Sequence, residues 1–430
     1  MNRIRRASIK IIYSGLFKSL SIYTVASFTN AAIPLLLLPL LTTHLSPADY
    51  GIITMFVTVQ AFLFPILGVN LEGAIARKFY SRDTDLSVYI GNSLLIFCCT
   101  TLLLLGLFFV FGNIIEIYTK IPRSWVLFIP IVTAAQFLGT LPLVLWQVRE
   151  KPLKYAGFQI SQSVINALLT IVFIILLSYN WTGRILSISL ATTLFALFAL
   201  FILWKQHDVR FVYNLSYIKH ALKYGGGLVP HAIGGMLILM TNRLFLTKMV
   251  SIEEAGMYGV ATQISSVIAF LTMSFNNAYV PWLFKKLTEN REGDKLKIVK
   301  LTYVYFAVIM LLGLAYYFIQ PIIFKYFVGA QFHSARQYCL WITLGFVFQG
   351  MYFMVTNYIN YAEKTHIQAL VTISIGILNI PLNYFCIKFF GAIGAAISFA
   401  TIFGLFFIFT WLLSAKVYQM PWLKISQRTA

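Results

Sequence analysis

The chain has 430 residues, of which 59% are hydrophobic and only 11% are charged, and its mean hydropathy is +0.81. A soluble protein of this length would carry roughly a quarter charged residues. The composition therefore excludes an ordinary soluble enzyme and indicates a chain that lies in lipid.

Apolar runs of membrane-spanning length recur along the whole chain. Backbone N–H and C=O groups in hydrocarbon must be satisfied within their own segment, so such runs must be helices. The alternating pattern of a membrane β-barrel is missing. Connections between the runs are short, which leaves no room for a soluble catalytic domain. We predict twelve spans, over residues 20–42, 50–71, 88–111, 124–147, 154–178, 184–204, 224–249, 258–280, 299–321, 337–360, 366–388 and 391–414.

The segment before the first span has its own pattern. Residues 3–19 alternate basic and apolar side chains in the manner of an amphipathic helix that lies on the cytoplasmic membrane face. The basic start is not followed by a small-residue cleavage site, so we expect no cleaved signal peptide.

The net charge of +20 follows the predicted topology. Lys and Arg concentrate in the N-terminal segment, in the loops after even-numbered spans and in the C-terminal tail, which places 25 of the 33 on one side. By the positive-inside rule both termini are cytoplasmic. The excess of basic residues therefore indicates how the chain is oriented in the membrane. It does not indicate a nucleic-acid partner, and we expect none.

The four cysteines all lie in predicted spans, at Cys98, Cys99, Cys339 and Cys386. Their spacing fits neither a metal site nor a disulfide framework, so they are interpreted as small core residues. We expect no catalytic residue, no metal site and no cofactor.

An internal repeat divides the chain into halves. "SPADYGIITMF" (46–56) matches "EAGMYGVATQI" (254–264) at an offset of 208, and "GRILSISLATTLFALF" (183–198) matches "GAIGAAISFATIFGLF" (391–406) at the same offset. Six helices per repeat give both halves one orientation, so they should surround a cavity at their interface. We predict two pseudo-symmetric six-helix bundles around a central polar cavity. The predicted parts are an amphipathic segment 1–19, a lobe 20–204, a basic linker 205–223, a lobe 224–414 and a cytoplasmic tail 415–430.

Several spans carry polar or small residues at helical spacing, in both halves. Any one such seam favours helix packing, because small and polar residues join membrane helices without a cavity. The seams taken together favour a polar-lined cavity. The candidate cavity residues are Asn30, Gln159, Asn166, His231, Asn242, Arg243, Asn360 and Asn379, and the candidate hinge residues are Pro34, Gly227, Pro230 and Gly235. A hydrogen-bonded core histidine remains the alternative for His231.

Charge within the spans discriminates between transporter classes. All thirteen Asp and Glu residues fall in loops or at span ends, whereas a cation-driven drug exporter ordinarily needs a carboxylate within the membrane. Arg243 lies inside the seventh span, and an unpaired arginine suits phosphate because its planar fork binds two oxygens. Two interpretations stay open: Arg243 is a cavity ligand, or it extends to the outer interface, as Lys248 does.

The motifs of the chain resemble a known family. They are "LLTTHLSPADYG", "YGGGLVPHAIGG", "TNRLFLTKMVSIEEAGMYGVATQ", "AYVPWLFKKL" and "GAIGAAISFAT". Together they resemble the polysaccharide-export branch of the multidrug/oligosaccharidyl-lipid/polysaccharide (MOP) exporter superfamily, and above all bacterial O-antigen flippases of the Wzx type. Many members have an Asp before the arginine of the seventh helix, where this chain has Asn242.

The resemblance implies a task for the protein. It is the transfer of an undecaprenyl-diphosphate-linked oligosaccharide, such as an O-antigen unit, from the cytoplasmic to the periplasmic leaflet by alternating access. A cation-coupled drug exporter is the alternative within the superfamily, and a glycosyltransferase or polymerase acting on polyprenyl-linked sugar is the alternative enzyme. Short outer loops disfavour the enzyme.

Partners and location follow from the same resemblance. Expected partners are the lipid-linked oligosaccharide, membrane lipids, and the polymerase and chain-length regulator of the same pathway. The expected location is the bacterial inner membrane. The sugar composition and the source of energy are not visible in the sequence.

Overall fold

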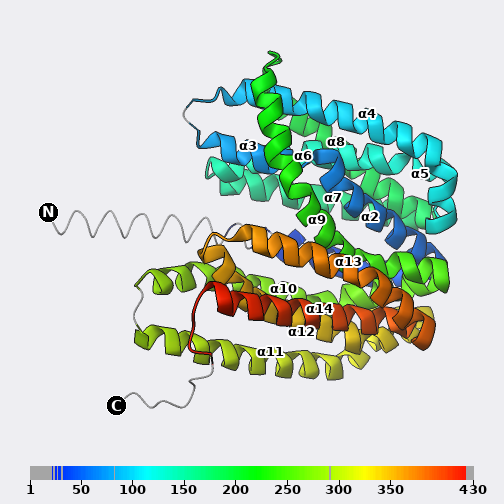
Figure 1. Ribbon diagram of the computed structural model, residues 1–430. Helices are drawn as coiled ribbons and strands as arrows, with labels where there is room; N and C mark the ends of the chain where they lie inside the picture. The colour runs from blue at the N-terminus through cyan, green and yellow to red at the C-terminus, as the bar shows by residue number, and fades with distance from the viewer. Residues whose placement is uncertain are drawn as a thin grey trace. The chain divides into compact units, whose positions relative to one another are not determined.

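Helices make up every regular element that the computed structural model describes, which covers residues 22, 25, 26, 28–30, 32–81, 83–289 and 292–422 (Figure 1). Eleven of these helices are long and apolar enough to cross a membrane, and the shorter helix Phe28–His44 lies where the first span was predicted. The prediction of an all-α membrane protein with about twelve spans is confirmed. The predicted segment 1–19 and tail residues 423–430 lie outside the described residues.

The first of two compact units comprises Met1–His44, Val59–Ile117 and Ile121–Val229. Trp146, Phe158, Phe195 and Ala199 form a buried cluster where α6, α7 and α8 meet. The helices of this unit are α3 (Leu71–Phe79), α4 (Leu86–Thr119), α5 (Arg123–Val126), α6 (Phe128–Val148), α7 (Pro152–Ile171), the π-helix η1 (Val172–Leu176), α8 (Trp181–Lys205), the end of α2 (Pro47–Gly68) and the start of α9 (Leu215–Met249).

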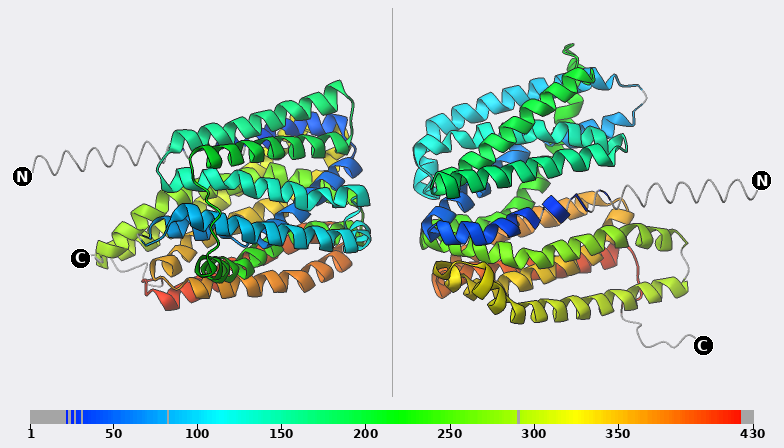
Figure 2. Two further views of the ribbon diagram at one scale, coloured as in Figure 1. Left: turned by 90° about the horizontal axis from the view of Figure 1, so that it is seen from above. Right: turned by 180° about the vertical axis from the view of Figure 1, so that it is seen from behind.

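The second unit comprises Leu45–Thr58, Tyr118–Lys120 and Pro230–Ala430. Within it, α12 contacts α10, α11 and α14, and α14 contacts α13 (Figure 2). It holds the start of α2, the end of α9, α10 (Ile252–Glu289), α11 (Glu292–Phe327), the 3-10 helix η2 (Ala330–Ala335), α12 (Arg336–Tyr361), α13 (Thr365–Phe390) and α14 (Ile393–Val417). The predicted two six-helix bundles around a central cavity stay a prediction.

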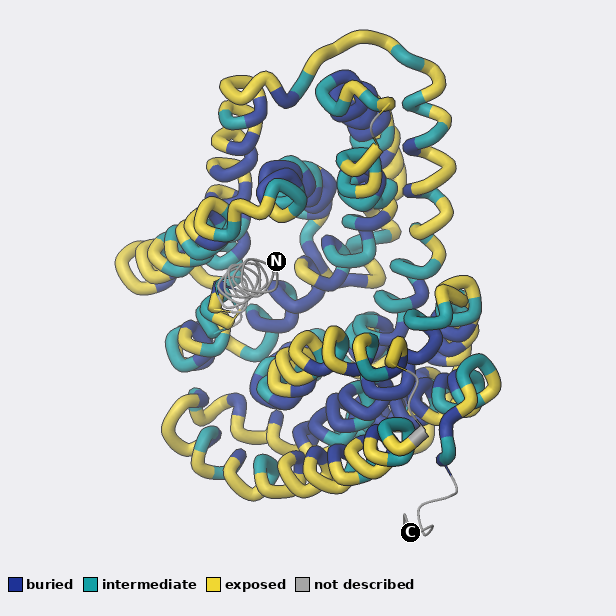
Figure 3. Tube along the Cα trace, turned by 90° about the vertical axis from the view of Figure 1, so that its left-hand side faces the viewer, coloured by how far each residue is buried: buried dark blue, intermediate teal, exposed yellow. Residues whose placement is uncertain are grey.

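Outer helices expose large apolar side chains, as contact with lipid requires. Leu102 and Phe109 of α4 and Leu311 and Phe318 of α11 are all exposed, and such faces are yellow in Figure 3. A helix that is apolar on every side is typical of a membrane span.

Local hydrogen bonds fix where several helices begin. Ahead of α2, the Asp49 amide donates to Ser46 Oγ and the Ser46 amide donates to Asp49 Oδ2, each at 3.1 Å, which is a capping box. Asn214 Oδ1 accepts from the amides of Ser216 (3.0 Å) and Tyr217 (3.2 Å) at the start of α9. The helix thus begins at Leu215, inside the predicted linker 205–223.

A backbone break follows α2. Val69 and Asn70 have φ values of 47° and 46°, in the left-handed region that non-glycine residues rarely adopt. The chain then starts the short helix α3 at Leu71. The predicted span 50–71 therefore ends in a break that its apolar run did not indicate.

The two repeat motifs contact each other within the second unit. A methyl group added at Gly51 of α2 would overlap the carbonyl oxygen of Ile252, and one at Gly256 of α10 would overlap that of Pro47. A methyl group added at Gly259 would lie only 2.5 Å from Thr54 Oγ1. The glycines of the repeat thus let two helix backbones approach closely, as small residues do in membranes.

Candidate functional site

Arg243 lies near the end of α9 and is partly buried in the second unit. Its Nη1 is 3.4 Å from Thr58 Oγ1 and 2.8 Å from Met240 Sδ. Thr58 is eleven residues into α2 from Pro47, about 16 Å along the helix at 1.5 Å per residue. The guanidinium therefore points toward α2 and lies level with Thr58 of that helix.

The positive charge of Arg243 has no acidic partner among the described residues. The ion pairs found there are Arg149–Asp208, Arg210–Asp85, Lys286–Glu289 and Lys286–Asp294. The titratable side chains that interact with Arg243 are the phenols of Tyr258 and Tyr50, and its Nε is buried without a hydrogen-bond partner. An unpaired buried donor costs about 1–3 kcal/mol, which an incoming oxygen acceptor would recover.

Lys248 has different surroundings from Arg243, five residues away on the same helix. Its side chain is exposed, and its Nζ lies 4.6 Å from the centre of the Tyr118 ring. This contact is a cation–π interaction at the helix end. Lys248 is therefore a matched control for substitutions of Arg243, because it carries the same charge on the same helix but is exposed.

Two predicted cavity residues are fully buried and donate to carbonyl groups of other helices. Asn242 is fully buried, and its Nδ2 donates to the Ala395 carbonyl at 2.6 Å. Asn379 is also fully buried; its Nδ2 donates to the Leu237 carbonyl at 2.7 Å, and its Oδ1 accepts from Asn383 at 2.8 Å. These bonds join α9 to α14 and to α13.

His231 and three of the hinge candidates, Gly227, Pro230 and Gly235, lie at the middle of α9, where the boundary between the two compact units falls between Val229 and Pro230. The His231 ring is partly buried, and its Nδ1 has no hydrogen-bond partner. A methyl group at Gly227 or Gly235 would meet no atom within 4 Å. The space around these glycines leaves room for α9 to bend at Pro230, whose ring interrupts helix hydrogen bonding.

The remaining candidates lie elsewhere. Asn360 is the second-last residue of α12 and is partly buried; its main-chain carbonyl accepts from the Glu363 amide at 3.1 Å. Pro34 lies in the helix Phe28–His44.

A polar seam in the first unit contains the other three candidates. The Ser163 hydroxyl donates to Asn30 Oδ1, and Gln159 Oε1 is buried without a partner. Asn166 Oδ1 accepts from Arg184 Nη1 at 2.6 Å, and the same Nη1 donates to Thr170 Oγ1 at 2.6 Å. The contact between Arg184 and Asn166 was not predictable from the sequence, because it joins α7 to α8 across 18 residues.

Glu72 is partly buried, although its sequence position predicts an acid at a span end. It follows the break at Val69 and Asn70 on α3, and its Oε2 is buried without a hydrogen bond. Burial raises the pKa of the Glu72 carboxyl above its usual value. A position at a span end therefore does not guarantee that an acid is solvated.

A model of one protein family matches residues 16–287, more than half of the chain, and its description is polysaccharide biosynthesis protein. The chain belongs to this family. A second family model, MatE, matches residues 233–385. In Haemophilus influenzae, an "uncharacterized membrane protein" is 25% identical over 363 residues, 82% of this chain and 85% of that one. Another, "Lsg locus putative protein 1", is 25% identical over 359 residues, 81% of this chain and 85% of that one.

Solved structures share the fold of this family member. The lipid II flippase MurJ, in an inward closed conformation, has a TM-score of 0.73 at 16% identity, covering 92% of this chain and 87% of MurJ. An inward-facing MATE family transporter of the MOP superfamily has a TM-score of 0.63 at 15% identity, covering 93% and 97%. At such identities the likeness shows the fold alone. With the family match, it confirms the superfamily that the motifs resemble.

Proposed function

We propose that the protein is a flippase for undecaprenyl-diphosphate-linked oligosaccharide units of a surface polysaccharide, such as O-antigen. It moves them from the cytoplasmic to the periplasmic leaflet by alternating access. The single observation that carries the proposal is the unpaired guanidinium of Arg243, which points toward α2 and lies level with Thr58. Membership of the polysaccharide biosynthesis protein family supports the same class of cargo.

The chemistry of Arg243 suits a diphosphate. Its present partners are a hydroxyl at 3.4 Å and a thioether, both weak acceptors compared with a phosphate oxygen. A planar guanidinium binds two phosphate oxygens at once, and a diphosphate offers several. The diphosphate would thus replace poor contacts with charge-assisted ones.

The sugar and the lipid tail make different demands. Sugar hydroxyls cannot cross hydrocarbon unaided, because each would lose its hydrogen bonds with water. In the first unit, Gln159 offers a buried oxygen that lacks a donor, and it is our candidate sugar contact. The polyprenyl tail is as apolar as the bilayer and stays in lipid.

A cation-coupled exporter is the second candidate. The MatE match over residues 233–385 and the buried Glu72 carboxyl favour it, since a carboxylate can bind a coupling cation. Against it, an organic cation would meet the uncompensated charge of Arg243. Glu72 also fits the flippase proposal, as a site at which a coupling proton binds.

The proposed setting is the bacterial inner membrane, with both termini in the cytoplasm. The chain then meets cargo that is assembled on the cytoplasmic side and delivers it to a polymerase and a chain-length regulator on the other side. The basic loops support this orientation.

The test compares Arg243 with Lys248 in cells that lack their own flippase. Arg243→Ala should reduce surface polysaccharide by about 10–100-fold, because a hydrogen bond to a charged group is worth about 1.5–3 kcal/mol. Lys248→Ala removes the same charge from the same helix and should leave the amount unchanged. Equal amounts of polysaccharide from wild type and Arg243→Ala, at equal protein levels, would refute the proposal.

A further inference from the structure

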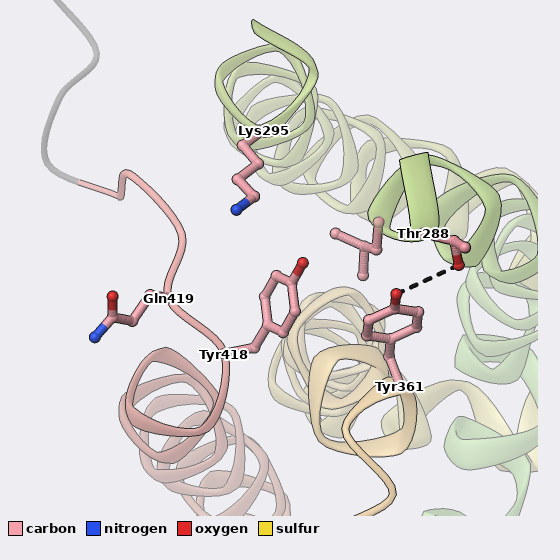
Figure 4. Close-up of a pocket in the computed structure, with 6 residues that line it drawn as sticks. Thr288, Lys295, Tyr361, Tyr418 and Gln419 are labelled. Carbon is pink, nitrogen blue, oxygen red and sulfur yellow. Dashed lines mark hydrogen bonds between the residues drawn. The ribbon is translucent and has the colours of Figure 1, made fainter. Parts of the chain in front are cut away.

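A pocket lies in the second unit, at the end of α10 that is opposite to its start at Ile252 (Figure 4). Its volume is about 480 Å³, within the range of small-molecule sites. The ends of α10, α11 and α12 and the segment after α14 form its walls, through Leu287, Thr288, Lys295, Tyr361, Tyr418 and Gln419. α10 has 38 residues, about 57 Å at 1.5 Å per residue, so its two ends reach opposite membrane faces.

The pocket carries a cation that no described acid neutralises. Lys295 is partly buried, and its Nζ lies 5.8 Å from the centre of the Tyr418 ring. Two of the acids near it in the chain, Glu289 and Asp294, both bind Lys286, at 3.0 and 3.1 Å. None of the ion pairs among the described residues includes Lys295. The pocket therefore favours an anion.

Hydroxyl groups line the same pocket as that cation. Tyr361 and Thr288 are hydrogen-bonded to each other at 3.3 Å on one side. Figure 4 shows the Lys295 amine and the Tyr418 hydroxyl facing the same space, with the Tyr361–Thr288 pair across from them. A phenol has an ordinary pKa of about 10 and burial raises the pKa of the Tyr418 phenol further, so this hydroxyl can donate at neutral pH. One ammonium and several hydroxyls suit a phosphate that carries a polyol.

The position of the pocket indicates where such a phosphate comes from. Loops after even-numbered spans, which include this one, face the cytoplasm in the predicted topology. All of its walls are helix ends or the residues directly after them, which the predicted topology places at the cytoplasmic membrane surface, and Leu287 adds a buried apolar wall. A ligand with acyl chains could leave them in the bilayer while its headgroup enters. Basic pockets between membrane helices on the cytoplasmic side bind anionic headgroups.

We propose that this pocket binds the glycerophosphate headgroup of an anionic phospholipid from the cytoplasmic leaflet. Lys295 pairs with the phosphodiester, and the hydroxyls of Tyr418, Tyr361 and Thr288 bind the glycerol. The bound lipid joins α10, α11, α12 and the segment after α14. It is a site separate from the cargo site proposed at Arg243, and it does not depend on the transported molecule.

The test is native mass spectrometry of the full chain in detergent, titrated with phosphatidylglycerol or phosphatidylethanolamine. Wild type should retain one phosphatidylglycerol in preference to phosphatidylethanolamine. Lys295→Gln should weaken that binding about fivefold, since a lysine near a charged headgroup contributes about 1 kcal/mol. Lys297→Gln removes an exposed charge two residues away, outside the pocket, and should change it less than twofold.

Further measurements distinguish lipid binding in the pocket from binding to surface charge and from binding of a soluble phosphate. Tyr418→Phe keeps the ring and should weaken binding about two- to tenfold through one lost hydrogen bond, so it carries the test if Lys295→Gln fails to fold. Equal losses in Lys295→Gln and Lys297→Gln would show binding to surface charge and overturn the proposal. Competition by sn-glycerol 3-phosphate as effective as the lipid would also overturn it, in favour of a soluble phosphate.

Discussion

Asn242 and Arg243 are neighbours on α9, yet their side chains have different partners. The Asn242 amide nitrogen donates to the Ala395 carbonyl and its Oδ1 is buried without a partner, whereas the Arg243 guanidinium has weak partners and a buried Nε without one. The sequence showed two adjacent polar residues in one span and could not separate their roles, because the roles depend on which helix each side chain meets.

Removing the Asn242 amide should therefore affect stability rather than transport. Asn242→Ala loses one buried hydrogen bond and should lower the free energy of unfolding by about 1 kcal/mol. Thermal unfolding in detergent measures the loss, and polysaccharide export per folded molecule should stay near the wild-type value. Export that fell as far as in Arg243→Ala would instead give Asn242 a direct part in transport.

Glu72 should make stability depend on pH. Its pKa is raised in the folded protein, so the folded state holds a proton that the unfolded state releases as pH rises above about 4.5. Stability from this group thus falls as pH rises through that window and up to the folded pKa. Glu72→Gln should raise the melting temperature at pH 8 and leave it unchanged at pH 4. An identical pH profile in wild type and variant would contradict this account.

At the scale of the elements, the close contact between α2 and α10 depends on glycine. Gly256→Ala would place a methyl group on the Pro47 carbonyl, which is backbone and cannot move aside. Gly106→Ala adds the same methyl group on an exposed face of α4 with no atom within 4 Å. We expect Gly256→Ala to lower the melting temperature clearly and Gly106→Ala to leave it within about 0.5 kcal/mol of wild type in stability. Equal behaviour of the two variants would refute the contact.

The elements differ in how far the sequence predicted them. The spans were predictable because an apolar run long enough to cross lipid has one stable conformation. The break at Val69 and Asn70 was not, since it interrupts a run that reads as continuous. The extension of α9 to Leu215 was missed as well, because residues 215–223 are polar and their helix depends on the Asn214 cap.

For the whole molecule, the repeat and the basic loops predicted the class of fold, and the family match agrees with it. The candidate site was predictable in part: Arg243 stood out by charge, while its contact with Thr58 joins residues 185 positions apart and left no sequence signal. Gln159 and Asn166 were selected by the same helical spacing, and only tertiary contacts distinguish the free Gln159 oxygen from the occupied Asn166.

Reporter fusions test the predicted orientation of the whole molecule in the membrane. Alkaline phosphatase fused after residue 430 should be inactive, and green fluorescent protein at the same place should fluoresce, because the basic loops and the tail face the cytoplasm. A fusion in the short loop between α9 and α10 should give the opposite result. Active phosphatase at the C-terminus would reverse the orientation.

Arg243 is proposed to bind the diphosphate of a lipid-linked sugar during transport. The most direct test of this claim is the rate at which purified protein in liposomes moves an undecaprenyl-diphosphate-linked oligosaccharide between leaflets. We predict that wild type and Lys248→Ala move it at equal rates and that Arg243→Ala is slower by about 10–100-fold. Equal rates for wild type and Arg243→Ala, in protein reconstituted to the same density, would contradict the claim.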